Sequence, residues 1–91
     1  MGEYVWVFHG DNADFCSAVF SDKEKAKTWI SEFSLSGILT QMPINKGIYN
    51  WTIESGFFSP SREYQKTGVF IQKFTSAYLK HHHFVNGVEQ D

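Results

Sequence analysis

Three consecutive histidines, His81 to His83, are the residues whose type and spacing most directly suggest chemistry. Side chains alternate along a strand, so His81 and His83 would share one face while His82 would lie on the other. Two imidazoles on one face provide half of a zinc site, and His9 could add a third ligand if its strand lies alongside. Structural zinc sites usually have four ligands, often with cysteine, and this chain has one cysteine. Polar strand-face histidines are therefore the default interpretation, and we expect no metal and no cofactor.

The other reactive side chains have equally plain explanations. Cys16 lies in an apolar stretch without a neighbouring base, which indicates a small buried hydrophobe rather than a nucleophile. Asp11 and Asp14 flank a turn, and the absence of a calcium-loop pattern favours a turn-stabilising role. Glu54, close to Trp51, is expected to be solvated on a surface helix. No phosphate-binding loop, zinc-protease motif or nucleophile elbow is present, so no catalytic residue is predicted.

Aromatic side chains are the remaining candidates for a functional role, because they make up 18% of the chain. Nine Phe, four Tyr and three Trp exceed what one core of this size must hide, so a few rings should be exposed. Exposed Trp and Tyr often anchor protein interfaces, although any single ring is more often part of a core. The best interface candidates lie in the irregular middle of the chain: Tyr49, Trp51, Phe57 and Phe58. With Asp11, Asp14 and Glu54 they form the predicted binding set.

Composition narrows the classes of partner. The chain has 91 residues, which indicates a single domain over 1–91. Its net charge is −2, its Lys and Arg are dispersed, and no basic stripe suggests nucleic acid. A neutral-to-acidic surface suits a protein partner, and a homodimer is a further possibility. The chain has no stretch long enough to span a membrane and no signal-peptide pattern, and its single cysteine argues against an oxidising compartment. We therefore expect a cytoplasmic protein without membrane association.

The elements that must position these residues begin with a hairpin and a helix. Residues 4–9 and 15–20 are rich in β-branched and aromatic residues and predict an antiparallel pair joined by a five-residue turn. Ser21 and Glu24 have the spacing of a capping box and predict a helix that begins at Ser21. Its apolar face comprises Ala26, Trp29, Ile30 and Phe33, whereas Lys23, Lys27 and Glu32 should meet water. Gly37 should end the helix in a left-handed conformation.

The second half of the chain is less regular. Residues 38–42 predict a strand, and 48–56 suit either a strand or a short helix, of which we favour the helix. Residues 59–68 predict a long loop, 69–74 one or two helical turns, and 77–85 a last strand. A turn at 86–87 should precede a frayed tail. The predicted fold class is α+β, with a small antiparallel sheet of about four strands, one main amphipathic helix on one face, and one or two short extra helices.

Several strings along the chain resemble a family of small uncharacterised bacterial proteins. The strings are WVFHG at 6–10, VFS at 19–21 followed by Glu24, Ala26 and WI at 29–30, and FTSA at 74–77 followed by His81 and His83. The resemblance covers almost the whole chain. It implies a bacterial origin and a free-standing domain, and it supplies no established activity.

Two functions follow as expectations. The first is a small non-enzymatic protein-binding module, such as an immunity protein that neutralises a bacterial toxin. The alternative is a small metal-dependent or hydrolytic enzyme that uses His9, His81 and His83. The enzyme requires those histidines to converge, whereas the binding module requires exposed aromatic side chains beside acidic ones.

Overall fold

The computed structural model describes residues 3–90, which divide into two compact units. The sheet unit contains the residues up to Ile44 and from Leu79 onward. The helical unit contains Asn45–Tyr78. The α+β class is confirmed, because one unit holds an antiparallel sheet with the main helix and the other holds short helices.

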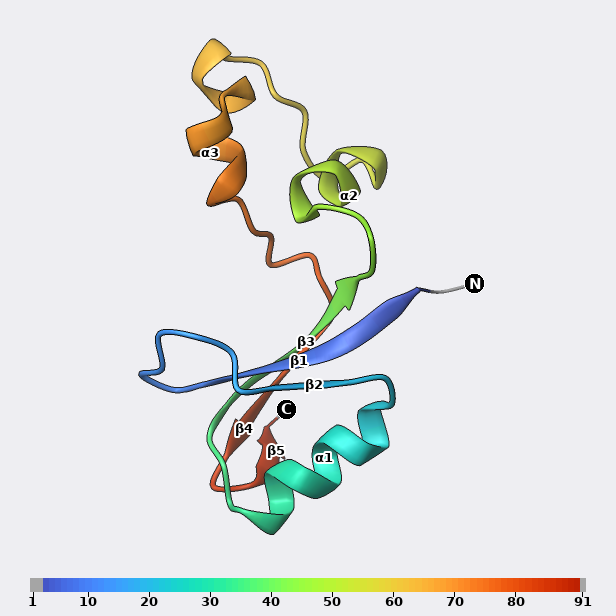
Figure 1. The fold of residues 1–91 in the computed structure, drawn as a ribbon, viewed down its shortest axis with the longest axis vertical. Helices are drawn as coiled ribbons and strands as arrows, with labels where there is room; N and C mark the ends of the chain where they lie inside the picture. The colour runs from blue at the N-terminus through green and yellow to red at the C-terminus, as the bar shows by residue number, and fades with distance from the viewer. Residues whose placement is uncertain (1–2, 91) are drawn as a thin grey trace. The chain divides into compact units, whose positions relative to one another are not determined.

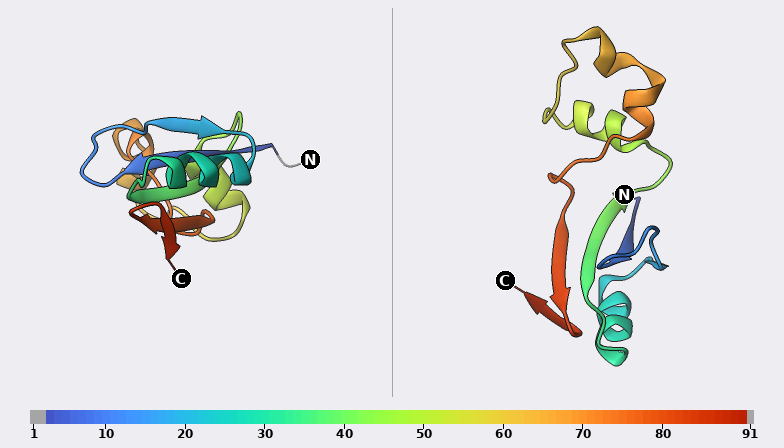
Figure 2. Two further views of the ribbon diagram at one scale, coloured as in Figure 1. Left: turned by 90° about the horizontal axis from the view of Figure 1, so that it is seen from below. Right: turned by 90° about the vertical axis from the view of Figure 1, so that its left-hand side faces the viewer.

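The sheet has five strands in the order β2-β1-β3-β4-β5, and each neighbouring pair is antiparallel. The strands are β1 (Tyr4–Gly10), β2 (Ala18–Phe20), β3 (Gly37–Pro43), β4 (His81–Val85) and β5 (Val88–Gln90). The longest pairing joins β1 to β3 over seven residues, from Tyr4 opposite Pro43 to Gly10 opposite Gly37. Helix α1 (Lys23–Glu32) lies across one face of this sheet (Figures 1 and 2).

The core of the sheet unit lies between α1 and this face. Ala26 and Ile30 of α1 have no exposed surface, and they pack with Phe8, Leu39 and Phe84 of the three central strands. Trp29 is partly buried at the margin, where its ring meets the rings of Phe8 and Phe20 edge-on or tilted. The predicted apolar face of the helix is therefore confirmed for three of its four members. Phe33 is the exception: it is the C-cap and remains 59% exposed, because the helix ends before that side chain reaches the core.

Both ends of α1 differ from the prediction. The helix begins at Lys23, and the Asp22 carboxylate accepts a hydrogen bond from the backbone N–H of Glu24 at 2.9 Å, so Ser21 is not the cap. At the other end the left-handed residue is Ser34, with φ +53°. The N–H groups of Ser34 and Leu35 then bond back to the carbonyls of Ser31 and Ile30. Two consecutive bonds of this kind close a helix without requiring glycine, although glycine is the usual residue there.

Gly37 serves a different purpose from the one predicted. It lies at the start of β3, where an added Cβ would sit 2.4 Å from the His9 carbonyl oxygen and 2.7 Å from Cζ of Phe8. The position requires glycine because the backbone of β1 and the ring of Phe8 approach it closely.

The first hairpin has a longer loop and a shorter second strand than predicted. β2 begins only at Ala18, opposite Phe8, so Phe15 and Cys16 lie in the loop and are exposed. Ala13 N–H donates to the Gly10 carbonyl within the loop, and Asp11 N–H ties the loop to the Ser36 carbonyl before β3. The prediction that Cys16 is a buried small hydrophobe is therefore wrong.

The predicted frayed tail is also wrong, because residues 88–90 form β5. Asn86 and Gly87 both have positive φ, +49° and +84°, which is the geometry of the tightest hairpin turn. The turn is tied to the connection between α1 and β3: Gly87 N–H donates to the Leu35 carbonyl at 2.7 Å, and Asn86 N–H donates to Ser36 Oγ at 2.9 Å.

The helical unit contains α2 (Ile48–Glu54), the 3₁₀ helix η1 (Glu63–Lys66) and α3 (Gly68–Gln72). The preference for a helix over 48–56 is confirmed, and Gly56 follows it with φ +82°. The predicted helical turns near 69–74 are confirmed as α3. The predicted loop over 59–68 is irregular only in part, because η1 occupies its second half.

Replacing Gly37 with Ala should lower the free energy of unfolding by about 1–3 kcal/mol, because the new methyl group overlaps backbone that is fixed by the β1–β3 ladder. Gly10→Ala is the matched control, since Gly10 pairs with Gly37 and its added Cβ would meet nothing closer than 3.8 Å. It should change stability by less than about 0.5 kcal/mol in urea unfolding. Equal losses in the two variants would contradict this explanation of Gly37.

The corrected helix cap gives a second prediction. Asp22→Ala removes the side chain that satisfies the Glu24 N–H and should cost about 1 kcal/mol. Ser21→Ala should cost less than about 0.5 kcal/mol in the same unfolding experiment. The reverse order would show that Ser21 caps the helix in solution.

Candidate functional site

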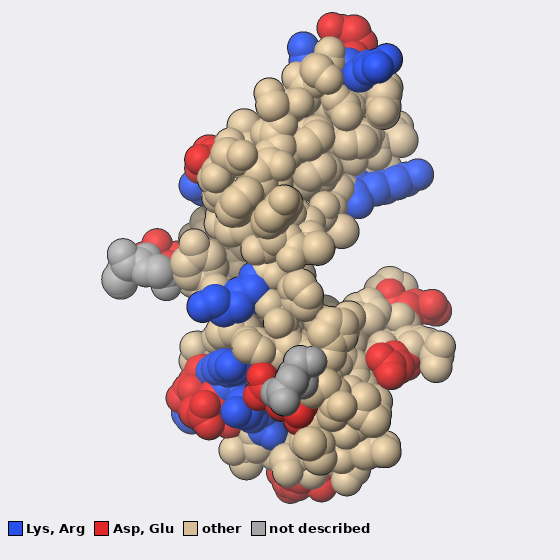
Figure 3. Space-filling view, turned by 180° about the vertical axis from the view of Figure 1, so that it is seen from behind, with Lys and Arg blue, Asp and Glu red and all other residues tan. Residues whose placement is uncertain are grey.

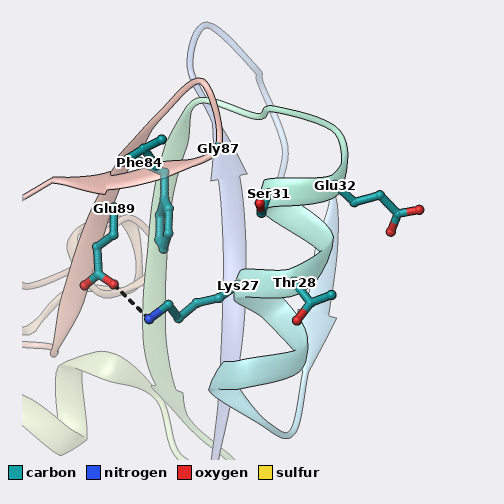
Figure 4. A pocket seen from close by; sticks show the side chains of 8 residues that line it. Lys27, Thr28, Ser31, Glu32, Phe84, Gly87 and Glu89 are labelled. Atoms are coloured by element: carbon teal, nitrogen blue, oxygen red, sulfur yellow. Dashed lines mark ion pairs between the residues drawn. The ribbon is translucent and has the colours of Figure 1, made fainter.

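A partly buried charge cluster lies between α1 and the β4–β5 hairpin in the sheet unit. Nδ1 of His82 lies 2.8 Å from one carboxylate oxygen of Glu89, and Nζ of Lys27 lies 3.2 Å from the other. The ammonium of Lys23 sits 5.7 Å above the ring of Trp6, whose centre lies 5.8 Å from that of His82. Figure 4 shows Lys27 reaching from α1 toward Glu89, beside Phe84. The cluster thus joins α1 to the last two strands.

Strand alternation places these groups on the helix-covered face. His82 lies opposite the fully buried Leu39, and Glu89 lies opposite the buried Phe84. Lys23 and Lys27 were expected to meet water, but both are only partly exposed, because Lys23 lies over Trp6 of β1 and Lys27 pairs with Glu89 of β5. The sequence analysis did not predict this cluster. The signal for it is two lysines four residues apart in the helix, together with a histidine and a glutamate near the C-terminus.

Burial lowers the pKa of His82 below its ordinary value of 6.5, and the Lys23 ammonium adds to this, although Glu89 opposes both. The Lys27 hydrogen bond lowers the pKa of Glu89 below its ordinary value. Near neutral pH the pair is therefore a neutral imidazole that donates its Nδ1–H to an ionised carboxylate. Nε2 of His82 is then an acceptor, and it is buried without a hydrogen-bond partner among the described residues.

His82 and Glu89 are hydrogen-bonded in the same way as the histidine–carboxylate pair of a general base, but the likeness ends there. A general base must come within about 2.6–3.2 Å of the proton that it removes. The unpaired Nε2 has less than 1 Å² of accessible surface, so a substrate does not reach it in this conformation. The groove beside it, between α1 and the hairpin, measures about 780 Å³ but is lined by Glu89 and not by His82. The geometry favours a structural role, in which the cluster fixes β5 and β4 to α1.

The opposite face of the sheet carries the other three histidines. The prediction that His81 and His83 share a face while His82 points the other way agrees with the register and burial of β4. The rings of His81 and His83 lie 5.4 Å apart. His9 lies in the same row as His83, but Ile38 of β3 stands between them. Nε2 of His9 donates to the Ala13 carbonyl, and Nδ1 of His81 donates to the Leu79 carbonyl.

These three histidines therefore do not converge, because one strand separates His9 from the pair and backbone carbonyls engage two of the rings. Within residues 3–90, no three His, Cys, Asp or Glu side chains lie close enough together to hold a metal ion. Cys16 is exposed in the loop between β1 and β2, whereas His81 and His83 are in β4.

The predicted binding residues lie in two places. Asp11 and Asp14 are exposed in the β1–β2 loop. The others are in the helical unit: Tyr49, Trp51, Glu54, Phe57 and Phe58. Glu54 is exposed on α2 and forms an ion pair with Lys46, which the sequence did not predict.

Aromatic rings form the interior of the helical unit. Tyr49, Phe58, Phe70 and Phe74 contact one another, with ring centres 5.0–6.3 Å apart. None of these rings is fully buried, and the only buried side chain of the unit is the polar Thr52. Tyr49 and Phe58 are thus scaffold more than contact surface, and Tyr49 also donates its hydroxyl to the Gln65 carbonyl at 2.9 Å.

Phe57 is the predicted aromatic binding residue that the structure leaves most exposed. Its ring stacks on that of Tyr78, with centres 4.2 Å apart and planes 5° from parallel. Phe57 is 46% exposed and Tyr78 is 64% exposed. Trp51 is half-buried, and its ring is tilted against that of Phe57, with centres 6.0 Å apart. Tyr78 was not predicted, because nothing in the sequence indicates that it returns to Phe57.

A family model described as a domain of unknown function (DUF7710) matches residues 5–90 of this chain. The chain belongs to this family. The resemblance to a family of uncharacterised proteins is confirmed to that extent. Neither the curated proteins nor the solved structures contain a match to the chain. Among residues 3–90 of this DUF7710 domain, no helix has the length and apolar character needed to cross a membrane.

The shifted pKa of His82 gives a stability prediction for the DUF7710 domain. Because the folded-state pKa lies below 6.5, the unfolded chain binds more protons, and the contribution of His82 is complete above about pH 6.5 and is lost as the pH falls below it. Glu89 adds a second loss as the pH falls below its ordinary value of 4.5, because its folded-state pKa is also lowered.

Urea unfolding at a series of pH values between 8 and 5 checks this expectation. His82→Gln should flatten the fall in stability between about pH 7 and pH 5. His83→Gln, on the exposed face of the same strand, is the matched control and should retain the wild-type slope. A wild-type slope in the His82 variant would show that the cluster does not sense pH.

Proposed function

We propose that this DUF7710 domain is a non-enzymatic protein-binding module of bacterial origin, and that the helical unit supplies its contact surface. The observation that carries the proposal is the incomplete core of that unit. Its 34 residues contain eight of the sixteen aromatic residues of the chain, yet no hydrophobic side chain in it is buried. Partly exposed aromatic surface of this density is typical of interfaces, where a partner completes the burial.

The contrast with the sheet unit supports the same proposal. Every buried hydrophobic residue of the described chain lies in the sheet unit, which therefore has a complete core of its own. Figure 3 shows that charged side chains of the helical unit, at the top of the view, lie around its margins and leave uncharged surface between them. Charged residues are depleted at the centre of protein interfaces, so uncharged surface with charges at its margins is compatible with an interface.

The site geometry offers less to the enzyme alternative. The histidines on the open face are held apart, and the one histidine–carboxylate pair has its free nitrogen buried. The narrower proposal is an immunity protein, whose partner is a toxin. The small size, the absence of a catalytic motif and the exposed aromatic surface support this narrower function. Its gene should then adjoin the gene for that toxin.

Affinity capture from the native organism tests the binding function. The full chain should retain one partner in stoichiometric amount, and the double variant Phe57→Ser with Tyr78→Ser should retain at least tenfold less, because it removes the exposed stacked pair. Phe33→Ser removes a ring of comparable exposure, 59%, from the sheet unit and should leave capture unchanged.

Recovery of no partner would contradict the binding function, and equal capture by the two variants would contradict the assignment to the helical unit. For the narrower proposal, co-expression with the neighbouring gene product should restore the growth that this product inhibits when expressed alone. Absence of inhibition or of protection would rule out the immunity role.

A further inference from the structure

The helical unit carries a groove of about 530 Å³ along η1 and α3. Its apolar lining comes from Tyr64, Val69, Phe70 and Phe74, and Lys73 contributes the one charged side chain. This groove is separate from the stacked Phe57–Tyr78 pair, whose residues do not line it.

The floor of the groove is held in place by the aromatic cluster beneath it. Tyr49 meets the edges or faces of Phe70 and Phe74, with ring centres 6.3 and 5.4 Å away. Its hydroxyl also holds η1 through the Gln65 carbonyl. Thr67, between η1 and α3, donates its hydroxyl to the Tyr64 carbonyl and accepts from Phe70 N–H. A groove formed in advance loses little conformational entropy when it binds.

The walls of the groove are open to water. Tyr64 and Val69 remain 61% and 63% exposed although they line it. Sites for small molecules usually enclose about 70–90% of the ligand surface, which walls this open do not achieve. A groove with open walls suits a few side chains that project from a longer polypeptide, so the lining favours a protein segment over a free metabolite.

The charge of the surface around the groove indicates which kind of polypeptide segment it would bind. No carboxylate of the described residues pairs with Lys73, and the ammonium of Lys66 reaches only Glu63, at 3.8 Å. The helical unit has three Lys and one Arg against two Glu, a net charge of +2, whereas the sheet unit has four Lys against eight acidic residues, a net charge of −4. The surface around the groove is therefore the basic part of an acidic chain, and it complements a negative partner.

We propose that this groove binds a short segment of a protein partner, one that inserts large apolar side chains and presents a carboxylate to Lys73. The proposal rests on the protein-binding function above and names its recognition chemistry. The apolar side chains cover Val69, Phe70 and Phe74, and the carboxylate supplies the pairing that Lys73 lacks among residues 3–90.

Selection from a random 12-residue peptide library displayed on phage, with the full chain as target, tests this chemistry. The enriched peptides should combine two or more large apolar residues with Asp or Glu. A synthetic copy of the most enriched peptide, measured by fluorescence anisotropy, should bind Val69→Ser about tenfold more weakly than the wild type. Ile71→Ser is the matched control on the same helix, because Ile71 is exposed but does not line the groove, and its affinity should be unchanged.

Charge reversal separates this recognition from simple apolar adhesion. Lys73→Glu should weaken binding of the acidic peptide and strengthen binding of a copy with lysines in place of its acids, whereas Lys80→Glu in the sheet unit should do neither. No enriched peptide, peptides without an acid, or equal loss in the Val69 and Ile71 variants would overturn the proposal. Capture of a cellular partner that Val69→Ser leaves intact would also overturn it, while the protein-binding function would stand.

Discussion

The packing of Ala26 and Ile30 against the central strands is the contact on which the sheet unit depends. Both residues are fully buried against Phe8, Leu39 and Phe84, and this fixes which face of every strand is dry. Because strand side chains alternate, the same contact sends His82 and Glu89 beneath the helix and His9, His81 and His83 to the open face. One hydrophobic contact therefore decides the environment of all four histidines.

The charge cluster beneath α1 is a consequence of this arrangement. A histidine that is forced to the covered face is desolvated, and it keeps one hydrogen bond by meeting Glu89 from the neighbouring strand. Lys27 satisfies the second carboxylate oxygen. The remaining nitrogen, Nε2, is buried and has no hydrogen-bond partner among residues 3–90. The cluster joins elements that are distant in sequence, and its hydrogen bond and ion pairs serve to hold these elements together.

The helical unit obeys a different constraint. Its three short helices have 7, 4 and 5 residues, which is too few for stability without packing. Aromatic rings supply that packing, because each ring can cover a large area from a single position. A unit with so few residues leaves its rings partly exposed. The aromatic side chains that stabilise the unit therefore also give it an apolar surface that can bind a partner. The concentration of positive charge on this part of an acidic chain adds selectivity to that surface.

The sequence by itself determined the elements whose cause is local. The period of Ala26, Trp29 and Ile30 fixed the buried helix face, the alternation of His81 to His83 fixed their faces, and Asn86-Gly87 fixed a turn. Tertiary structure decided what depends on partners distant in sequence: the cap at Asp22, the crowding at Gly37, the pairing of the tail as β5, and the exposure of Cys16. It also decided the site. Lys27 and Glu89 are 62 positions apart in the sequence, farther than any local motif extends. Phe57 meets Tyr78 only because the helical unit folds back on itself.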